Sequence, residues 1–343
     1  MDADQHTSHI IGGPHGLEAA AGAVVTGREL KALGVPAETL AERCRPGGPW
    51  RRVLPGVYLL HPGAPSGEER VRAALLYAGR PPGAGGPADQ GREALVTGRA
   101  ALALHRFTTV PSLPDVPAID ILVPYQRRLR DSGGVRIHRT RELPRPFDVG
   151  GLPCAPVPRA VADALAGPPQ EPPLEPESVR RLLTEAVLGG HCDPASLLRE
   201  LAAAGLPDRP EVTAALPALR EAGRRAAEQR LYTMVRCYGL PDPVWNVELR
   251  LPGGPPLGTV DAYWPEHAVA VAVDDRTGAA DDDALWAPAA ALRERLDALG
   301  ITLAHLTPAE LRDAIERQAT VVRTALIDSA DRGPAAYVVV TPH

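Results

Sequence analysis

Three carboxylates in the last third of the 343-residue chain have the spacing of a metal-dependent site. Glu228 falls in a segment whose apolar residues recur at helical spacing. Asp261 lies in a strand-like segment, and Asp274 ends an apolar run typical of a buried strand. Carboxylates converging from a helix and two strands can hold Mg²⁺, which activates water and stabilises a leaving oxygen. Glu228, Asp261 and Asp274 are therefore candidate catalytic residues, and Asp261 and Asp274 are candidate metal ligands.

The elements that must position these acids are predicted in the order α-β-β-β-α-β-α. Gly239 suits the end of the first helix, and Gly253-Gly254 suits the turn of a hairpin. Thr307-Pro308-Ala309-Glu310 is a capping box that opens the last helix. The predicted helices cover 226–239, 284–299 and 308–327, and the predicted strands cover 244–251, 258–264, 268–273 and 301–306.

This order resembles the PD-(D/E)XK nuclease core, and more narrowly the very-short-patch-repair-like endonuclease domain common in actinobacterial proteins. The family's helical glutamate is matched by Glu228, and its strand aspartate by Asp261 in Val-Asp-Ala-Tyr-Trp-Pro. The family's next strand reads Glu-(Tyr/Val)-Asp-Gly and is followed by histidine. Here Ala272 replaces the glutamate, Asp274 keeps the aspartate, and Asp275 replaces the glycine with no histidine after it. The resemblance implies a restriction-endonuclease-like domain whose catalytic site is degenerate.

Two interpretations of this site stay open. Asp275 or Asp281–Asp283 could replace the missing glutamate, or they form a solvated acidic loop. No lysine can replace the family's histidine, because Lys31 is the only lysine in the chain. Loss of positioned acid–base help costs roughly 10²–10⁴-fold in rate, which favours a decayed site without cofactor over an active Mg²⁺-dependent endonuclease.

Residues 23–66 are predicted to form a winged helix-turn-helix. Thr26 and Glu29 make a capping box, and Gly34 stops the first helix. A second helix is expected from Pro36 to about Cys44, followed by a hairpin over residues 50–60.

The hairpin also resembles the wing of AbiEi-type antitoxins of type IV toxin–antitoxin systems, Trp-x-Arg-x-x-Pro-Gly-Val-Tyr. Such a fold places its second helix in the major groove and its wing on phosphate. Glu38 and Glu42 on the presumed recognition helix repel phosphate, so a protein-contact role stays open. The candidate phosphate ligands are Arg28, Arg43, Arg45, Arg51 and Arg52.

The middle α/β segment, residues 67–166, is predicted to hold helices over 68–78 and 97–107 and strands over 118–124 and 134–140. A basic ridge around the second strand could contact a nucleic-acid backbone or be a solvated loop. Arg159 and Asp163 lie four residues apart in a segment that again resembles the antitoxin-like proteins, and they are predicted to form a structural ion pair. The ridge comprises Arg127, Arg128, Arg130, Arg136 and Arg139.

The remaining segments connect or flank these domains. Residues 1–22 are predicted to be a flexible lead-in, and 167–177 a stiff proline-rich linker. Residues 178–220 form a helical connector before the 221–330 nuclease-like domain. In the tail, residues 331–343, the segment 335–340 either adds an edge strand to the sheet or has no regular structure.

The composition narrows the possible classes of function further. The net charge of −5 gives no global basic field that would attract nucleic acid. Isolated cysteines predict neither a zinc site nor a disulfide framework. Without a signal peptide or an 18-residue apolar run, the expected location is the cytoplasm, with no membrane partner.

The sequence thus predicts an α/β DNA-binding protein of the antitoxin-like or transcriptional-regulator kind. The alternatives are a metal-dependent endonuclease and a protein-interaction module. The expected partners are double-stranded DNA and a cognate toxin or other protein. The oligomeric state has no signature in the sequence.

Overall fold

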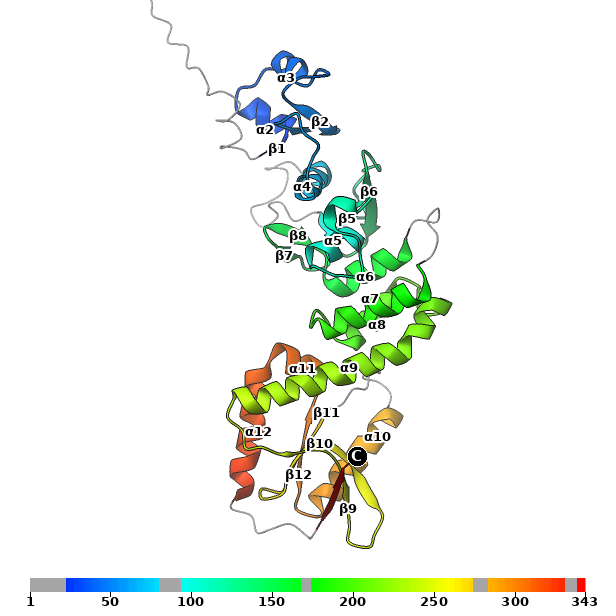
Figure 1. Cartoon of the computed structure of the whole chain (residues 1–343), viewed down its shortest axis with the longest axis vertical. Helices are drawn as coiled ribbons and strands as arrows, with labels where there is room; N and C mark the ends of the chain where they lie inside the picture. The colour runs from blue at the N-terminus through cyan, green and yellow to red at the C-terminus, as the bar shows by residue number, and fades with distance from the viewer. Residues whose placement is uncertain (1–22, 80–93, 168–173, 274–282, 331–337, 343) are drawn as a thin grey trace, which may run out of the picture. The chain divides into compact units, whose positions relative to one another are not determined.

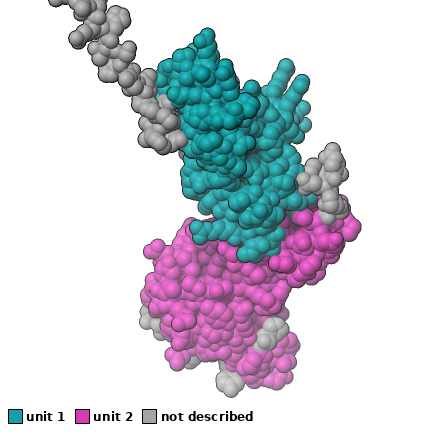
Figure 2. Space-filling model, turned by 45° about the horizontal axis from the view of Figure 1, so that its top comes forward, with its two compact units in different colours: residues 1–171 teal, residues 172–343 magenta. Residues whose placement is uncertain are grey.

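The computed structural model of the chain combines helices with mixed sheets, so the protein belongs to the α/β class. The structure describes residues 23–79, 94–167, 174–273, 283–330 and 338–342. The chain divides into two compact units, residues 1–171 and 172–343 (Figure 2). Each unit is described by itself.

The first unit begins with a three-stranded sheet and two short helices (Figure 1). The predicted helices and hairpin of residues 23–66 are present, and the Thr26–Glu29 capping box forms as expected. A strand before the first helix was not predicted, because three residues are too few to show an alternating pattern. Val25, Leu30 and Trp50 form the core of this part. The elements are β1 (Val24–Thr26), α2 (Gly27–Ala32), α3 (Ala37–Arg43), β2 (Arg51–Leu54) and β3 (Val57–Leu59), with sheet order β1-β3-β2.

A five-stranded sheet forms the rest of the first unit. Its two longest strands, β5 (Ile119–Pro124) and β6 (Val135–Thr140), were predicted and pair in parallel. The helix predicted over 97–107 is shorter, because residue 97 ends a strand and the helix stops at Leu104 with His105 as its C-cap. The other elements are α4 (Gly67–Ala78), β4 (Leu95–Thr97), α5 (Gly98–Leu104), η1 (Leu113–Asp115), β7 (Phe147–Val149), β8 (Leu152–Cys154) and α6 (Val157–Ala166), and the strand order is β6-β5-β4-β8-β7.

Three helices open the second unit: α7 (Pro176–Leu188), α8 (Pro194–Ala203) and α9 (Pro210–Cys237). The proline-rich linker predicted over 167–177 overlaps the start of α7, and its residues 168–173 lie outside the described part. The boundary predicted between residues 220 and 221 falls inside α9, a helix of 28 residues that runs through this point without a break. Helical connector and nuclease-like segment therefore share one helix.

The second unit is built on a five-stranded sheet of order β12-β11-β10-β9-β13 (Figure 1). Side chains from α9, α11 and α12 pack with one apolar cluster of the sheet, whereas Leu292 and Leu296 of α10 pack with the other. The expected order α-β-β-β-α-β-α is present from α9 onward. Its further elements are β9 (Val244–Arg250), β10 (Pro256–Trp264), β11 (Val269–Val273), α10 (Asp283–Asp297), β12 (Thr302–Leu306), α11 (Pro308–Asp313), α12 (Ile315–Ala330) and β13 (Val339–Pro342).

Two details of the last elements differ from the expectation. The single helix predicted over 308–327 is broken at Ala314, whose φ of −144° leaves the helical region and separates α11 from α12. The tail contributes β13, which pairs antiparallel with β9, so the edge-strand alternative is the one found. Among the described helices none is both long and apolar enough to cross a membrane.

Candidate functional site

Glu228 lies on α9 with its carboxylate fully engaged by neighbouring side chains. Asn246 Nδ2 donates to Glu228 Oε1 at 2.6 Å, and the Tyr232 hydroxyl donates to the same oxygen at 3.2 Å. Arg224 Nη1 lies 3.7 Å from the other oxygen, Oε2. The helix thus brings the predicted acid to β9, where an amide, a hydroxyl and a guanidinium contact it.

Asp261 lies on β10 and reaches the end of the neighbouring strand. Its Oδ2 accepts a hydrogen bond from the backbone N–H of Val273, the last residue of β11, at 2.7 Å. Asp274 is the next residue and lies outside the described part of the chain. The predicted adjacency of the two strand ends is therefore present in the backbone, but the Asp274 side chain cannot be placed.

The sheet is distorted at this point. Val260 packs in the α10-side cluster and Ala262 in the α9-side cluster, although residues two apart on a regular strand share a face. Opposite them, Asn246 has a φ of +49°, which few residues other than glycine adopt. At this distortion Asn246 reaches Glu228 on α9, and Asp261 reaches the end of β11.

The two acids share one electrostatic neighbourhood. The pKa of Tyr232 is raised, first by burial and then by the charge and hydrogen bond of Glu228, with Asp261 adding to it. The pKa of Arg224 is also raised, mainly by Glu221, and both Glu228 and Asp261 contribute. Both acids therefore contribute to the electrostatic environment of Tyr232 and Arg224.

A metal site does not follow from these two residues. Among the described residues, no group of three His, Cys, Asp or Glu side chains could hold a metal ion. Ala272, at the position of the missing glutamate, packs with the apolar cluster on the α10 side. The side chains of Asp275 and Asp281–Asp283 lie outside the described part. Two carboxylates, one of them tied to an amide, fit Mg²⁺ poorly, because that ion requires a near-octahedral shell of oxygens.

The predicted phosphate ligands of residues 23–66 are mostly exposed. Arg28, Arg45 and Arg52 are open to solvent, and Arg51 is exposed while donating to the Gly63 carbonyl at 3.2 Å. Arg43 is different, because its guanidinium stacks 4.4 Å above the Trp50 ring. Four cationic side chains are thus available to a ligand, and one is used in packing.

Helix α3 is held only loosely by the core. None of its residues is buried, and Leu40 and Arg43 are the α3 side chains that contact the cluster around Trp50. Its Glu38 and Glu42 are exposed, as expected from the sequence. The outer face of α3 is therefore open to a partner but acidic.

The basic ridge is partly structural. Arg127 donates to the carbonyls of Ala78 at 2.7 Å and Gly79 at 3.0 Å, so it caps the end of α4. Arg139 donates to the carbonyls of Arg127 and Leu129 and holds the loop between β5 and β6. Among the five predicted ridge arginines, Arg128 and Arg130 are exposed and do not hold a helix end or a loop in this way.

The fifth ridge residue, Arg136, belongs to a polar cluster that the sequence did not predict. Its Nε lies 3.3 Å from Asp120 Oδ1, and His138 Nε2 lies 2.7 Å from the same oxygen. Burial opposes the charged ring of His138, but the hydrogen bond and charge of Asp120 outweigh it and raise the pKa of His138. Only the parallel pairing of β5 and β6 brings these residues together, so no local spacing could have indicated the cluster.

The predicted Arg159–Asp163 pair lies on the same side of the sheet as this cluster, because Thr97, which contacts Asp163, is the cross-strand partner of Asp120. Arg159 Nε lies 2.9 Å from Asp163 Oδ1, and the Thr97 hydroxyl donates to Asp163 Oδ2 at 2.6 Å. Thr97 is completely buried. The pair therefore fastens α6 to β4, which is the structural role expected of it.

No family model matches the chain, and no curated protein matches it. The two family resemblances consequently rest on the motifs themselves.

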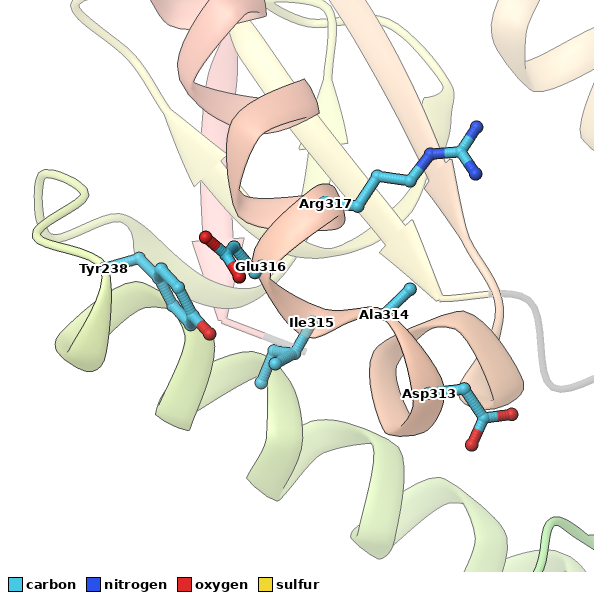
Figure 3. Close-up of a pocket in the computed structure, with 6 residues that line it drawn as sticks. All are labelled: Tyr238, Asp313, Ala314, Ile315, Glu316 and Arg317. Carbon is cyan, nitrogen blue, oxygen red and sulfur yellow. The ribbon is translucent and has the colours of Figure 1, made fainter.

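A hollow in the second unit lies beside the break between α11 and α12 (Figure 3). Tyr238 at the end of α9 faces Ile315 and Glu316, whereas Asp313 and Arg317 extend away from it. The pKa of Asp313 is lowered, first by its hydrogen bond to Arg312, so this carboxylate already has a partner. The charged groups do not converge, and the hollow has no arrangement suited to catalysis.

Proposed function

We propose that the protein binds double-stranded DNA through an N-terminal winged helix, as an antitoxin-like or transcriptional-regulator protein. The observation that carries the proposal is the exposure of Arg28, Arg45, Arg51 and Arg52 around the hairpin. Helix α3 supports the proposal, because none of its residues is buried and its outer face is open to a DNA groove. A toxin or other protein remains a proposed second partner, and DNA binding would imply a cytoplasmic location.

The nuclease-like domain is proposed to be a catalytically inactive platform. Glu228 is hydrogen-bonded to Asn246 and Tyr232, and Ala272 cannot supply a third carboxylate. Water activation requires a metal shell that these residues do not provide.

The second candidate function is a metal-dependent DNA endonuclease. One observation favours it: the strand distortion at Asn246 and Asp261, because strained backbone gathers at functional sites. Glu228, Asp261 and Asp274 would be its catalytic residues, with Mg²⁺ on Asp261 and Asp274.

The test uses supercoiled plasmid and a fluorescent duplex with the full-length protein. We expect duplex binding whose logarithmic affinity falls linearly with the logarithm of the salt concentration. Arg45→Gln should weaken that binding and reduce the slope by about 1. Arg72→Gln is the matched control, because Arg72 is an exposed arginine paired with Glu68 at 2.7 Å on α4.

The same plasmid decides between the two candidates. With Mg²⁺ or Mn²⁺ we expect a shifted but uncut plasmid for the wild type and for Asp261→Ala. Cleavage by the wild type that is lost in Asp261→Ala would establish the endonuclease instead. Absence of salt-dependent duplex binding would refute the DNA-binding proposal.

A further inference from the structure

A cavity of about 230 Å³ lies in the first unit where the hairpin meets the β5–β6 part of the larger sheet. Four consecutive residues of β2, Arg51 to Leu54, line one side of it. Because β2 is an edge strand in the order β1-β3-β2, this side runs along a backbone edge with which no other strand of the described residues pairs.

The lining is cationic. Arg51, Arg52 and Arg70 all contribute, and no acidic residue is among the described residues that line the cavity. Arg70 is fixed by donating to the carbonyls of Pro114, Val116 and Pro117 at 3.1, 2.7 and 3.2 Å. It therefore supplies a positive charge at a fixed position, but few free donors.

Arg51 and Arg52 retain donors for a ligand. Arg51 uses Nη1 for the Gly63 carbonyl, and within the described part of the chain Arg52 has no hydrogen-bond or ion-pair partner. Both side chains are exposed, so neither is needed for the core. A guanidinium presents paired N–H groups that match two oxygens of a phosphate.

Glycines keep the opposite wall thin. Gly133 and Gly134, with φ of +54° and +78°, form the tight turn that leads into β6. A Cβ at Gly133 would come within 2.7 Å of Leu54 Cδ2 and 3.2 Å of the Val53 carbonyl. The turn thus approaches β2 closely, and no side chain of its own fills the space.

The floor is apolar. Leu54, Ile119 and Val135 line the cavity and are at most 4% exposed. A phosphodiester within a rigid duplex can contact a convex cationic surface, but the rest of the duplex keeps it from entering a recess of this kind. A terminal phosphate, with its extra negative charge and free end, can enter the recess.

We propose that this cavity is a binding site for a phosphate monoester, with Arg51 and Arg52 as its ligands. The phosphate can come from a free nucleoside monophosphate or from the 5′-phosphorylated end of a strand. The site shares Arg51 and Arg52 with the proposed duplex-binding surface, but its ligand is a terminal phosphate and not an internal phosphodiester.

Isothermal titration of the full-length protein tests the proposal with inorganic phosphate, adenosine 5′-monophosphate and adenosine. We expect stoichiometric binding of the monophosphate, detectable binding of phosphate and none of adenosine. Arg51→Gln and Arg52→Gln should each weaken the monophosphate at least tenfold. Arg52→Lys, which keeps the charge but loses the paired donors, should fall between them and the wild type.

Two controls separate this site from the duplex-binding surface. Arg45→Gln and Arg72→Gln should leave monophosphate binding unchanged, although Arg45→Gln weakens duplex binding. A short oligonucleotide with and without its 5′-phosphate then distinguishes the two sources. Tighter binding of the phosphorylated strand indicates a strand end, and equal binding of both strands indicates the free monophosphate.

The proposal is overturned if the monophosphate binds no better than adenosine. It is equally overturned if Arg51→Gln combined with Arg52→Gln leaves the affinity intact. Neither result would bear on duplex binding, which has its own salt-dependent assay.

Discussion

Asp120 illustrates how much one side chain can organise. It is 7% exposed, and a single oxygen, Oδ1, serves both His138 and Arg136. A buried carboxylate without partners would be costly, so the two cations offset its desolvation. In turn Asp120 favours the protonated form of His138.

The stability of the first unit should therefore depend on pH through His138. Its raised folded-state pKa means that the stabilisation is fully present below the ordinary histidine pKa of roughly 6.5. The stabilisation is lost as the pH rises through the folded-state value. We expect His138→Gln to lower the free energy of unfolding in urea at pH 5.5 more than at pH 8.5.

His61 provides the matched control for this experiment. It lies 2.9 Å from Glu69, but in a more exposed pair than Asp120 and His138. His61→Gln removes a histidine that is paired with Glu69 and not with Asp120, so it serves as the reference against which the effect of His138→Gln is measured. An equal pH dependence in wild type and His138→Gln would contradict the role assigned to Asp120.

The roles of individual residues were the hardest feature to predict from the sequence. Arg127 and Arg128 are neighbours of the same type, yet one caps a helix 48 residues away and the other is exposed. Only the tertiary structure distinguishes them, because the partners of Arg127 are backbone carbonyls with no sequence signature. Glu228 and Asp261, by contrast, lie on a helix and on a strand, as the sequence predicted.

At the scale of elements, α9 carries an unusual internal proline. Pro217 lies eight positions into the helix and is exposed. It cannot donate to the Thr213 carbonyl, and its ring disfavours the preceding turn. The helix continues past it because buried residues on both sides, such as Val212 and Leu219, pack into the unit.

Replacing this proline should stabilise the second unit. Pro217→Ala restores the missing N–H and should raise the free energy of unfolding by about 1–3 kcal/mol. Pro176→Ala is the control, because Pro176 occupies the first turn of α7, where proline is tolerated, and it should give no gain. Chemical denaturation followed by circular dichroism measures both. No gain from Pro217→Ala would mean that the helix is already distorted to fit the proline.

Elements with local signatures were predicted well. The capping boxes at Thr26 and Thr307 form as expected, and the apolar run ending at Val273 is a central strand. The strands that escaped prediction, β1, β4, β7 and β8, have three residues each and exist only through pairing with partners elsewhere. The break at Ala314 also has no local signal, since neither glycine nor proline occurs there.

At the scale of the whole molecule, each of the two units has apolar clusters of its own. Val25, Leu30 and Trp50 pack together in the first, and two clusters cover the five-stranded sheet of the second. Domains with their own cores commonly fold alone.

We therefore expect residues 1–171 and 172–343, expressed separately, to fold and unfold cooperatively. Each should reproduce its part of the circular dichroism spectrum and its own unfolding transition. Calorimetry of both pieces and of the full chain checks this, because the enthalpies should add. A piece that shows no cooperative unfolding transition when expressed alone would mean that its stability depends on the other piece.

The pairing of β13 with β9 has a consequence for synthesis on the ribosome. Thr341 Oγ1 donates to the Glu248 carbonyl across 93 positions of the chain. While those intervening residues are being translated, β9 exposes an uncovered edge that another nascent chain could join. Glu248 and Arg250 place charges on this strand, and charged side chains discourage edge-to-edge association. Strand β9 thus carries its own protection against aggregation during the interval before its partner β13 is made.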